Sequence, residues 1–461
     1  MARLMVPSGL KLTELNTLIR GNRDNSLLTK KVLVLYTTII KKMFRKGFRP
    51  QSDDDRFVQI GLAEREAIFR KDQVKVFELL EKNLLLEVKK DIDKETGEEK
   101  DYYRYGSAGS SAKRYAIPAR LLNGKPKFEI IKEENHKIKK VTANLARDKE
   151  KKVKEIQDTA LLEMVETLKK VKFCNEKATL AIINDNTPMK LLNAKSLGNL
   201  TLFDYMTFLN GNLCEEYYQD YYGERLQHFK MYVPKALRYC CMYFEGYDNE
   251  EVSELDIANS QPYFFCCLSP ELVEKLLPEF ASEELTYILT KMRQAECFQR
   301  FQEICIQGKL KEEFSKVLSD KFTKAEIKEI IFSVMYCDYN KKNKQHRRQL
   351  EAFKSMFPGV YEGLRAIKEL NWTHLKENCN PRSKKKGNYT NASLIIQRLE
   401  SRVILGQVVP IINRQVTKTF FTIHDSIVCL KKDEENIKDT MIQCFKNLGL
   451  EPPVINNKKE I

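Results

Sequence analysis

Two aspartates lie where short apolar strands are expected to end or turn. In Val252–Phe265 (VSELDIANSQPYFF) an alternating strand leads to Asp256, and small residues follow before an aromatic helix begins. In Thr419–Leu430 (TFFTIHDSIVCL) two apolar runs flank His424 and Asp425, so we expect a hairpin with Asp425 at its tip. Carboxylates brought together at rigid strand ends can hold the divalent cations of phosphoryl transfer. The plainer alternative is a turn or capping role for each aspartate.

A segment between the two aspartates predicts a helix with cations and rings on one face. Thr323 and Glu326 form a capping-box pattern, so a helix should begin near Lys324. Four residues recur at every fourth position: Lys324, Lys328, Phe332 and Tyr336. Two cations near a helix N-terminus, with two rings beyond them, suit a triphosphate with a stacked base. The alternative is that the lysines pair with neighbouring glutamates and the rings belong to the core.

The preceding elements predict a small N-terminal domain. Apolar residues at helical spacing predict helices over Ser26–Phe44, Leu62–Phe69 and Asp72–Asn83, and a hairpin follows from Glu87 to Tyr105. This order resembles a winged helix, with Asp72–Asn83 in the position of the recognition helix. We therefore expect residues 1–122 to form a winged-helix-like nucleic-acid-binding domain. A protein-interaction module of the same size is the alternative.

The next segment changes in composition. Residues 130–173 mix both charge signs and contain neither proline nor glycine, which predicts a long polar helix. We expect residues 123–220 to form a helical arm, with a solvated linker helix as the alternative. Residues 221–461 then hold both aspartates and the cation-bearing helix.

The composition favours a polyanionic partner. The chain has 461 residues with a formal net charge of +15, and lysine and arginine on one face neutralise phosphates. Hydrophobic residues make up 42%, which excludes a mainly disordered chain. No apolar run is long enough to span a bilayer, and none of the 12 cysteines falls in C-x-x-C spacing. We expect a cytoplasmic protein without a membrane partner.

The order of the three chemical segments resembles motifs A, B and C of the family A DNA polymerases and the related single-subunit phage-type RNA polymerases. The resemblance implies that Asp256 and Asp425 bind two Mg²⁺ ions and that Lys324 and Lys328 contact the triphosphate. It also implies that Lys328 is catalytic, as a proton donor to the leaving pyrophosphate. Phe332 and Tyr336, by the same resemblance, pack beside the nascent base pair.

Weaker matches extend the resemblance to the nucleic acid. Gly223-Glu-Arg225 and the later Arg238 are similar to the family's region that approaches template and primer. Gln397, on a helix before the hairpin, is a minor-groove contact by resemblance. We expect His424 to orient the hairpin or to contact the primer end rather than to act as a base. The resemblance also implies that the helical arm of residues 123–220 corresponds to the family's thumb. The sequence departs from the family after Asp256, where the glutamate that helps to exclude the ribose 2′-hydroxyl is missing.

We expect an α+β fold in which a right-hand polymerase palm, built on a small antiparallel sheet, carries helical fingers. The function predicted by the resemblance is a template-directed DNA polymerase of a phage or mobile-element replication module. It would extend a primer on a DNA template, with nucleoside triphosphates as substrates. An RNA polymerase or primase, with RNA among its partners, is one alternative. A non-catalytic DNA-binding replication protein is the other.

Overall fold

The structure is a computed structural model of the 461-residue chain. It describes residues 2–18, 25–45, 57–92, 99–101, 103–105, 111–122, 128–150, 153–154, 156–174, 202–210, 217–233, 235–318, 322–339, 344–377 and 387–458. The chain divides into two compact units. The N-terminal unit comprises Met1–Lys151, Val171–Glu216 and His228–Glu245, and the C-terminal unit comprises Lys152–Lys170, Tyr217–Gln227 and Gly246–Ile461.

Both units are α+β, with many helices and small antiparallel sheets, so the expected fold class is confirmed. The helices of the N-terminal unit are α1 (Leu12–Leu18), α2 (Asn25–Arg45), α3 (Leu62–Phe69), α4 (Gln73–Lys82), α5 (His136–Glu150), α8 (Leu202–Asn210) and α9 (Lys235–Cys241). Its strands are β1 (Ala2–Pro7), β2 (Val58–Gln59), β3 (Glu87–Val88), β4 (Lys90–Ile92), β5 (Glu99–Asp101), β6 (Tyr103–Tyr105), β7 (Ser111–Ala116), β8 (Phe128–Glu133), β10 (Val171–Phe173) and β13 (Met242–Phe244).

The three helices expected near the N-terminus are present as α2, α3 and α4. β2 and β3 pair on either side of β7, and β4 pairs with β5. An aromatic cluster around Phe44 of α2 forms part of the core, with Phe208 at 4.6 Å and Tyr205 at 5.1 Å between ring centroids. The winged-helix interpretation of residues 1–122, and the three domain boundaries expected from the sequence, stay predictions.

The prediction of one long polar helix over residues 130–173 is wrong, because a strand lies at each end of this segment. β8 begins this segment and pairs with β1, with Leu4 opposite Ile131 and Met5 opposite Ile130. β10 ends it and pairs with β13, and α5 and α6 (Thr159–Lys169) lie between. The apolar partner strands β1 and β13 are distant in sequence, so tertiary pairing overrides a local composition that favours helix.

The C-terminal unit contains a four-stranded antiparallel sheet in the order β15-β16-β14-β17. Its strands are β14 (Val252–Ile257), β15 (Phe420–Ile423), β16 (Ser426–Leu430) and β17 (Ile455–Asn457). Every residue of β15 and β16 is buried, because these continuous apolar runs have helices packed around them. A second, smaller sheet joins β9 (Val153–Lys154), β11 (Tyr218–Asp220) and β12 (Leu226–Gln227).

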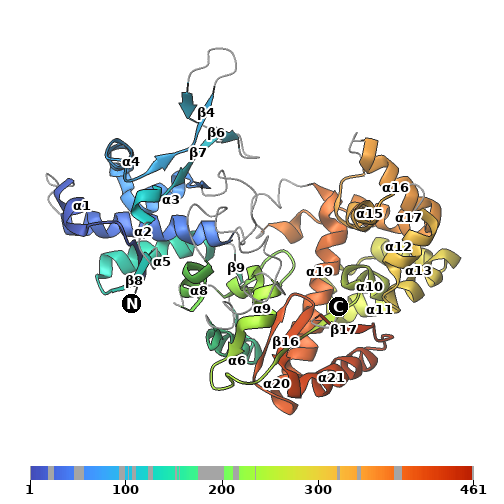
Figure 1. Ribbon diagram of the computed structural model, residues 1–461. Helices are drawn as coiled ribbons and strands as arrows, with labels where there is room; N and C mark the ends of the chain where they lie inside the picture. Colours follow the sequence, from blue (N-terminus) through green and yellow to red (C-terminus); the bar gives the residue numbers. More distant parts are fainter. Residues whose placement is uncertain are drawn as a thin grey trace. The chain divides into compact units, whose positions relative to one another are not determined.

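Two groups of helices flank the four-stranded sheet in Figure 1, with α20 and α21 below it and the group from α12 to α17 above. Besides α6, the α-helices of this unit are α10 (Ser260–Cys267), α11 (Pro270–Leu276), α12 (Glu283–Arg293), α13 (Glu296–Ile306), α14 (Leu310–Leu318), α15 (Lys324–Tyr336), α16 (Lys344–Met356), α17 (Pro358–Glu369), α19 (Asn391–Val403), α20 (Val409–Gln415) and α21 (Glu434–Asn447). A π-helical turn, η10 (Ile404–Val408), joins α19 to α20. Within the described ranges, no helix is long and apolar enough to cross a membrane.

Candidate functional site

The register of the four-stranded sheet brings the two aspartates together. β14 runs antiparallel to β16, and Asp256 lies opposite Ser426 in this ladder. His424 and Asp425 form the two-residue turn between β15 and β16. The strand-end position of Asp256 and the hairpin-tip position of Asp425 therefore follow the sequence prediction. Adjacent strands lie about 4.8 Å apart, so the turn presents Asp425 beside Asp256.

The electrostatics of Asp256 reflect this proximity. Burial and, next, the negative charge of Asp425 raise the pKa of its carboxyl group to about 6, against the opposing effect of Lys458. A carboxyl group with this pKa gains from a nearby cation, because the cation favours its charged form. Lys458, which follows β17, supplies one cation through an ion pair with Oδ1 of Asp256.

A third carboxylate lies on the same strand. Glu254 is 1% exposed, and its Oε1 accepts a hydrogen bond of 3.1 Å from the hydroxyl of Ser426. Nζ of Lys458 lies 3.2 Å from the same oxygen. Burial by itself lowers the pKa of Lys458, but the charges of Asp256 and Glu254 outweigh this effect and raise it. Lys458 therefore bridges two carboxylates of β14.

The donor set suits a divalent cation that prefers oxygen. Asp256 and Asp425 both supply carboxylate oxygens, the ligands that Mg²⁺ takes in phosphoryl-transfer sites. Their mutual repulsion, seen in the raised pKa of Asp256, is relieved by added positive charge. In the described part of the chain, no group of three or more histidine, cysteine or acidic side chains has the geometry of a complete metal centre. Two carboxylates can still hold a cation whose remaining ligands are waters and substrate phosphates.

Both turns beside the carboxylates contain a strained residue. Asn259, which follows β14, and His424 have φ values of 52° and 57°, in the left-handed region. Nδ2 of Asn259 and Nδ1 of His424 are buried and lack a hydrogen-bond partner among the described residues. Such strain and unpaired polar atoms are typical of sites that bind a ligand. Burial lowers the pKa of His424 to about 4, with Arg225 contributing, so the imidazole is neutral at pH 7.

The helix that carries the predicted nucleotide contacts begins where the sequence predicts. The Thr323 hydroxyl accepts a hydrogen bond from the backbone N–H of Glu326, and the Glu326 carboxylate accepts one from the N–H of Thr323, which confirms the capping box of α15. Lys324 and Lys328 lie on this helix, but their side chains lie outside the described residues. The predicted pairing of these lysines with triphosphate stays a prediction.

The two rings of α15 differ in their surroundings. Phe332 is 51% exposed, so it is not the core residue of the plainer interpretation, and it stacks on Tyr336 with 5.9 Å between ring centroids. The Tyr336 hydroxyl donates a hydrogen bond of 2.7 Å to Oε1 of Gln261 on α10. This bond joins α15 to the segment that follows Asp256.

The connection continues from Gln261 to a buried ion pair. Nε2 of Gln261 donates to Oε2 of Glu400 on α19, and Arg225 lies 2.7 Å from Oε1 of the same carboxyl group. Glu400 is fully buried, and burial raises its pKa to about 8 although Arg225 opposes the change. These contacts form one polar chain that passes beside the carboxylate pair. The chain, here called the relay, consists of Arg225, Glu400, Gln261 and Tyr336.

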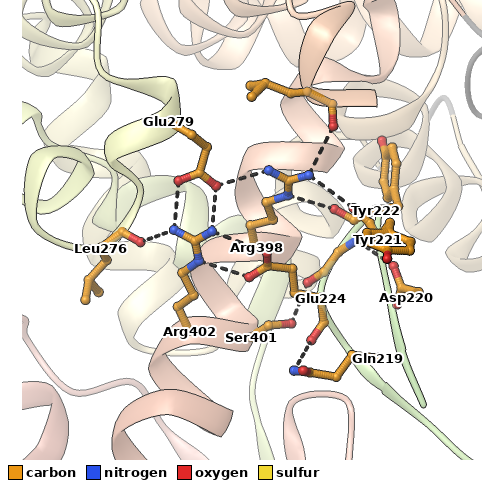
Figure 2. A network of polar contacts seen from close by, with 12 residues as sticks. Gln219, Asp220, Tyr221, Tyr222, Glu224, Leu276, Glu279, Arg398, Ser401 and Arg402 are labelled. Atoms are coloured by element: carbon orange, nitrogen blue, oxygen red, sulfur yellow. Dashed lines mark hydrogen bonds and ion pairs between the residues drawn. The ribbon is translucent and has the colours of Figure 1, made fainter. Parts of the chain in front are cut away.

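A network of polar contacts around Arg398 and Arg402 fixes α19, as Figure 2 shows. The same helix carries Gln397 and Glu400. Arg398 donates to Glu279 and to the backbone oxygens of Tyr221 and Tyr222. Arg402 pairs with Glu279 at 2.6 Å and with Glu224 at 3.0 Å. The carboxylate of Glu279 therefore bridges both arginines. The contacts with Tyr221, Tyr222 and Glu224 tie α19 to the turn before Arg225.

The predicted nucleic-acid contacts fall into two groups. Arg225, Gln397 and His424 lie in the C-terminal unit. A Cβ atom added to Gly223 would lie 2.8 Å from Oε1 of Gln397, so only glycine allows this side chain to approach the turn. Arg238 lies on α9 in the N-terminal unit and is 4% exposed. The predicted role of each residue in nucleic-acid binding stays a prediction.

Sequence reasoning missed four residues of this site: Glu254, Gln261, Glu400 and Lys458. Glu254 alternates with Asp256 on one strand and could have been noticed as a second acidic residue facing the same side. Glu400 lies in LIIQRLESRVIL, a helical segment with apolar residues at both ends, and a carboxylate in such a segment is a signal of a buried pair. Lys458 carried no signal, because β17 is only three residues long.

Comparisons with known proteins give a structural similarity at low sequence identity. No protein-family model and no curated protein sequence matches this chain. Among solved structures, the chain is similar to the POL domain of Pol1 from M. smegmatis in a complex with DNA primer-template and dNTP. The sequence identity is 12% and the TM-score is 0.32. The match covers 62% of this chain and 55% of that chain.

Proposed function

We propose that this protein is a template-directed nucleic acid polymerase that extends a primer 3′-hydroxyl with nucleoside triphosphates. The single observation that carries the proposal is the pairing of β14 with β16, which presents Asp256 and Asp425 side by side. Two adjacent carboxylates on a rigid sheet suit two-metal nucleotidyl transfer. The order of the three chemical segments along the chain, with its resemblance to family A polymerases, supports the same reaction.

In the proposed reaction the primer 3′-hydroxyl attacks the α-phosphorus of the incoming nucleotide, and pyrophosphate leaves. Asp256 and Asp425 would hold two Mg²⁺ ions, which supply charge neutralisation at the attacking and leaving oxygens. Lys324 and Lys328 would neutralise the triphosphate, and Lys328 would protonate the leaving pyrophosphate. Neutral His424 at the hairpin tip would contact the primer end.

The relay positions the nucleotide in this proposal. Phe332 presents an exposed ring, and Tyr336 is fixed by its bond to Gln261, so the two rings can pack against a base and its sugar. Gln261 lies five residues after Asp256, and its amide links the ring to Glu400. A DNA polymerase is the leading assignment. An RNA polymerase or primase is the second, and the absence of a glutamate after Asp256 favours this second assignment.

Primer extension with Mg²⁺ tests the proposal, with dNTPs and NTPs supplied separately. Extension with dNTPs alone supports the DNA polymerase, and extension with NTPs supports the RNA polymerase or primase. Asp425→Ala should abolish either product. The protein could instead bind primed DNA and yield no product with dNTPs or with NTPs, on primed or on unprimed template. It would then be a non-catalytic DNA-binding protein, and this result would contradict the proposal.

A further inference from the structure

Lys458 reaches the carboxylate pair because the sheet delivers it there. β17 pairs with β14, with Asn456 opposite Asp256 and Asn457 opposite Leu255. One residue further, the backbone N–H of Lys458 donates a hydrogen bond of 2.9 Å to the carbonyl oxygen of Glu254. This ladder fixes the start of the Lys458 side chain beside β14.

The ammonium group of Lys458 lies between two carboxylates, as a bound metal cation would. It pairs with Oδ1 of Asp256 and lies 3.2 Å from Oε1 of Glu254. The Lys458 side chain is 20% exposed and that of Glu254 is 1% exposed, so water screens these charges little. The Coulombic attraction between these charges is therefore stronger than between charges on the surface, although the cost of removing them from water offsets part of it.

A divalent cation bound by Asp256 would compete with Lys458 for the same carboxylate and would be repelled by the ammonium group. Mg²⁺ binds carboxylate oxygens at about 2.0–2.1 Å, which leaves no room for an ammonium on the same lone pairs. Lysine carries its charge on a flexible four-carbon stem, so the group can leave while the backbone of β17 stays in the ladder.

We propose that Lys458 is a tethered cation that holds the carboxylates of Asp256 and Glu254 until a divalent cation displaces it. The inference rests on the proposed function, because it takes Asp256 and Asp425 as the metal ligands. The tether lowers the affinity for free divalent cations, and it keeps the acidic strand paired when no metal and substrate are bound. The C-terminal strand thereby sets the metal concentration at which the site fills.

Binding of Mn²⁺ alone, followed by the electron paramagnetic resonance signal of free Mn²⁺, tests the inference without any turnover. Lys458→Met should bind Mn²⁺ about tenfold more tightly than the wild type, because one nearby positive charge is lost. Lys458→Arg keeps the charge and should bind no more tightly than the wild type. Lys432→Met is the matched control, since Lys432 pairs with Glu250 at the surface, and its affinity should be unchanged.

Amine labelling followed by mass spectrometry tests the displacement itself. In the wild type, Mg²⁺ should increase the labelling of Lys458 several-fold and leave the labelling of Lys432 unchanged. Equal Mn²⁺ affinity in the wild type and Lys458→Met, or labelling of Lys458 that ignores Mg²⁺, would overturn the tether. In that case the metal site of the proposed function still stands if the double variant, Asp256→Asn with Asp425→Asn, no longer binds Mn²⁺. Equal weak binding by all variants, this double variant included, would overturn the metal site and the tether together.

Discussion

Asp256 lies directly opposite Ser426 in the antiparallel ladder of β14 and β16, and this pairing places the neighbouring Asp425 beside it. A shift of one residue in this register would turn Asp256 to the other face of the sheet. The register is fixed by the buried apolar residues of both strands, so the geometry of the carboxylate pair depends on the core. The proposed chemistry and the stability of the sheet are therefore linked.

The buried carboxyl group of Glu400 predicts a pH dependence of stability. Its pKa is about 8 in the folded protein and 4.5 in the unfolded chain, so the folded state binds more protons between these values. Stability should therefore fall as the pH rises from 4.5 to 8, by at most about 1.4 kcal/mol per pH unit. Urea unfolding at a series of pH values measures this slope.

Glu400→Gln removes the titrating group and should flatten that slope, although its single amide oxygen can accept from Arg225 or from Gln261 but its NH₂ group cannot accept from the other. Glu400→Ala leaves Arg225 without its buried partner and should cost about 3–5 kcal/mol of unfolding free energy. An unchanged slope in Glu400→Gln would show that Glu400 is not the titrating group.

The shared carboxylate of Glu279 predicts a large loss of stability on substitution. Glu279→Ala removes the partner of both Arg398 and Arg402, whose remaining contacts are backbone oxygens and Glu224. We expect a loss of about 2–4 kcal/mol, measured by urea unfolding, because the buried Arg398 loses its acidic partner and Arg402 loses one of two. Glu369→Ala on α17 is the control, since its exposed pair with Arg365 contributes about 1 kcal/mol or less. Equal losses in both variants would contradict the role given to Glu279.

The exposed ring of Phe332 predicts a selective effect on nucleotide use. Phe332→Ala should leave the melting temperature within a few degrees of the wild type, because the ring is 51% exposed. Its KM for the incoming nucleotide should rise about tenfold, since stacking on a base is worth about 1–3 kcal/mol. Tyr287→Ala, on a similarly exposed ring of α12, should change neither quantity. An unchanged KM in steady-state primer extension would remove Phe332 from the nucleotide site.

Much of the site follows from local sequence patterns. Asp256 at a strand end, the turn at Asp425 and the capping box at Thr323 are set by residues close in sequence, and all three are present in the structure. The relay could not be predicted as a unit, because Arg225 and Glu400 are 175 residues apart and meet only through tertiary packing. The same limit explains the error over residues 130–173, where β1 and β13 supply distant partner strands.

The central claim is that Asp256 and Asp425 together perform nucleotidyl transfer. The most direct measurement is single-turnover extension of a primed DNA template by Asp256→Asn and Asp425→Asn, beside DNA binding by the same proteins. The control is Asp439→Asn, on an exposed position of α21. We predict that both site variants bind DNA like the wild type. Their rate of extension should fall by at least about a thousandfold, while the control stays active. Extension at the wild-type rate by either site variant would contradict the central claim.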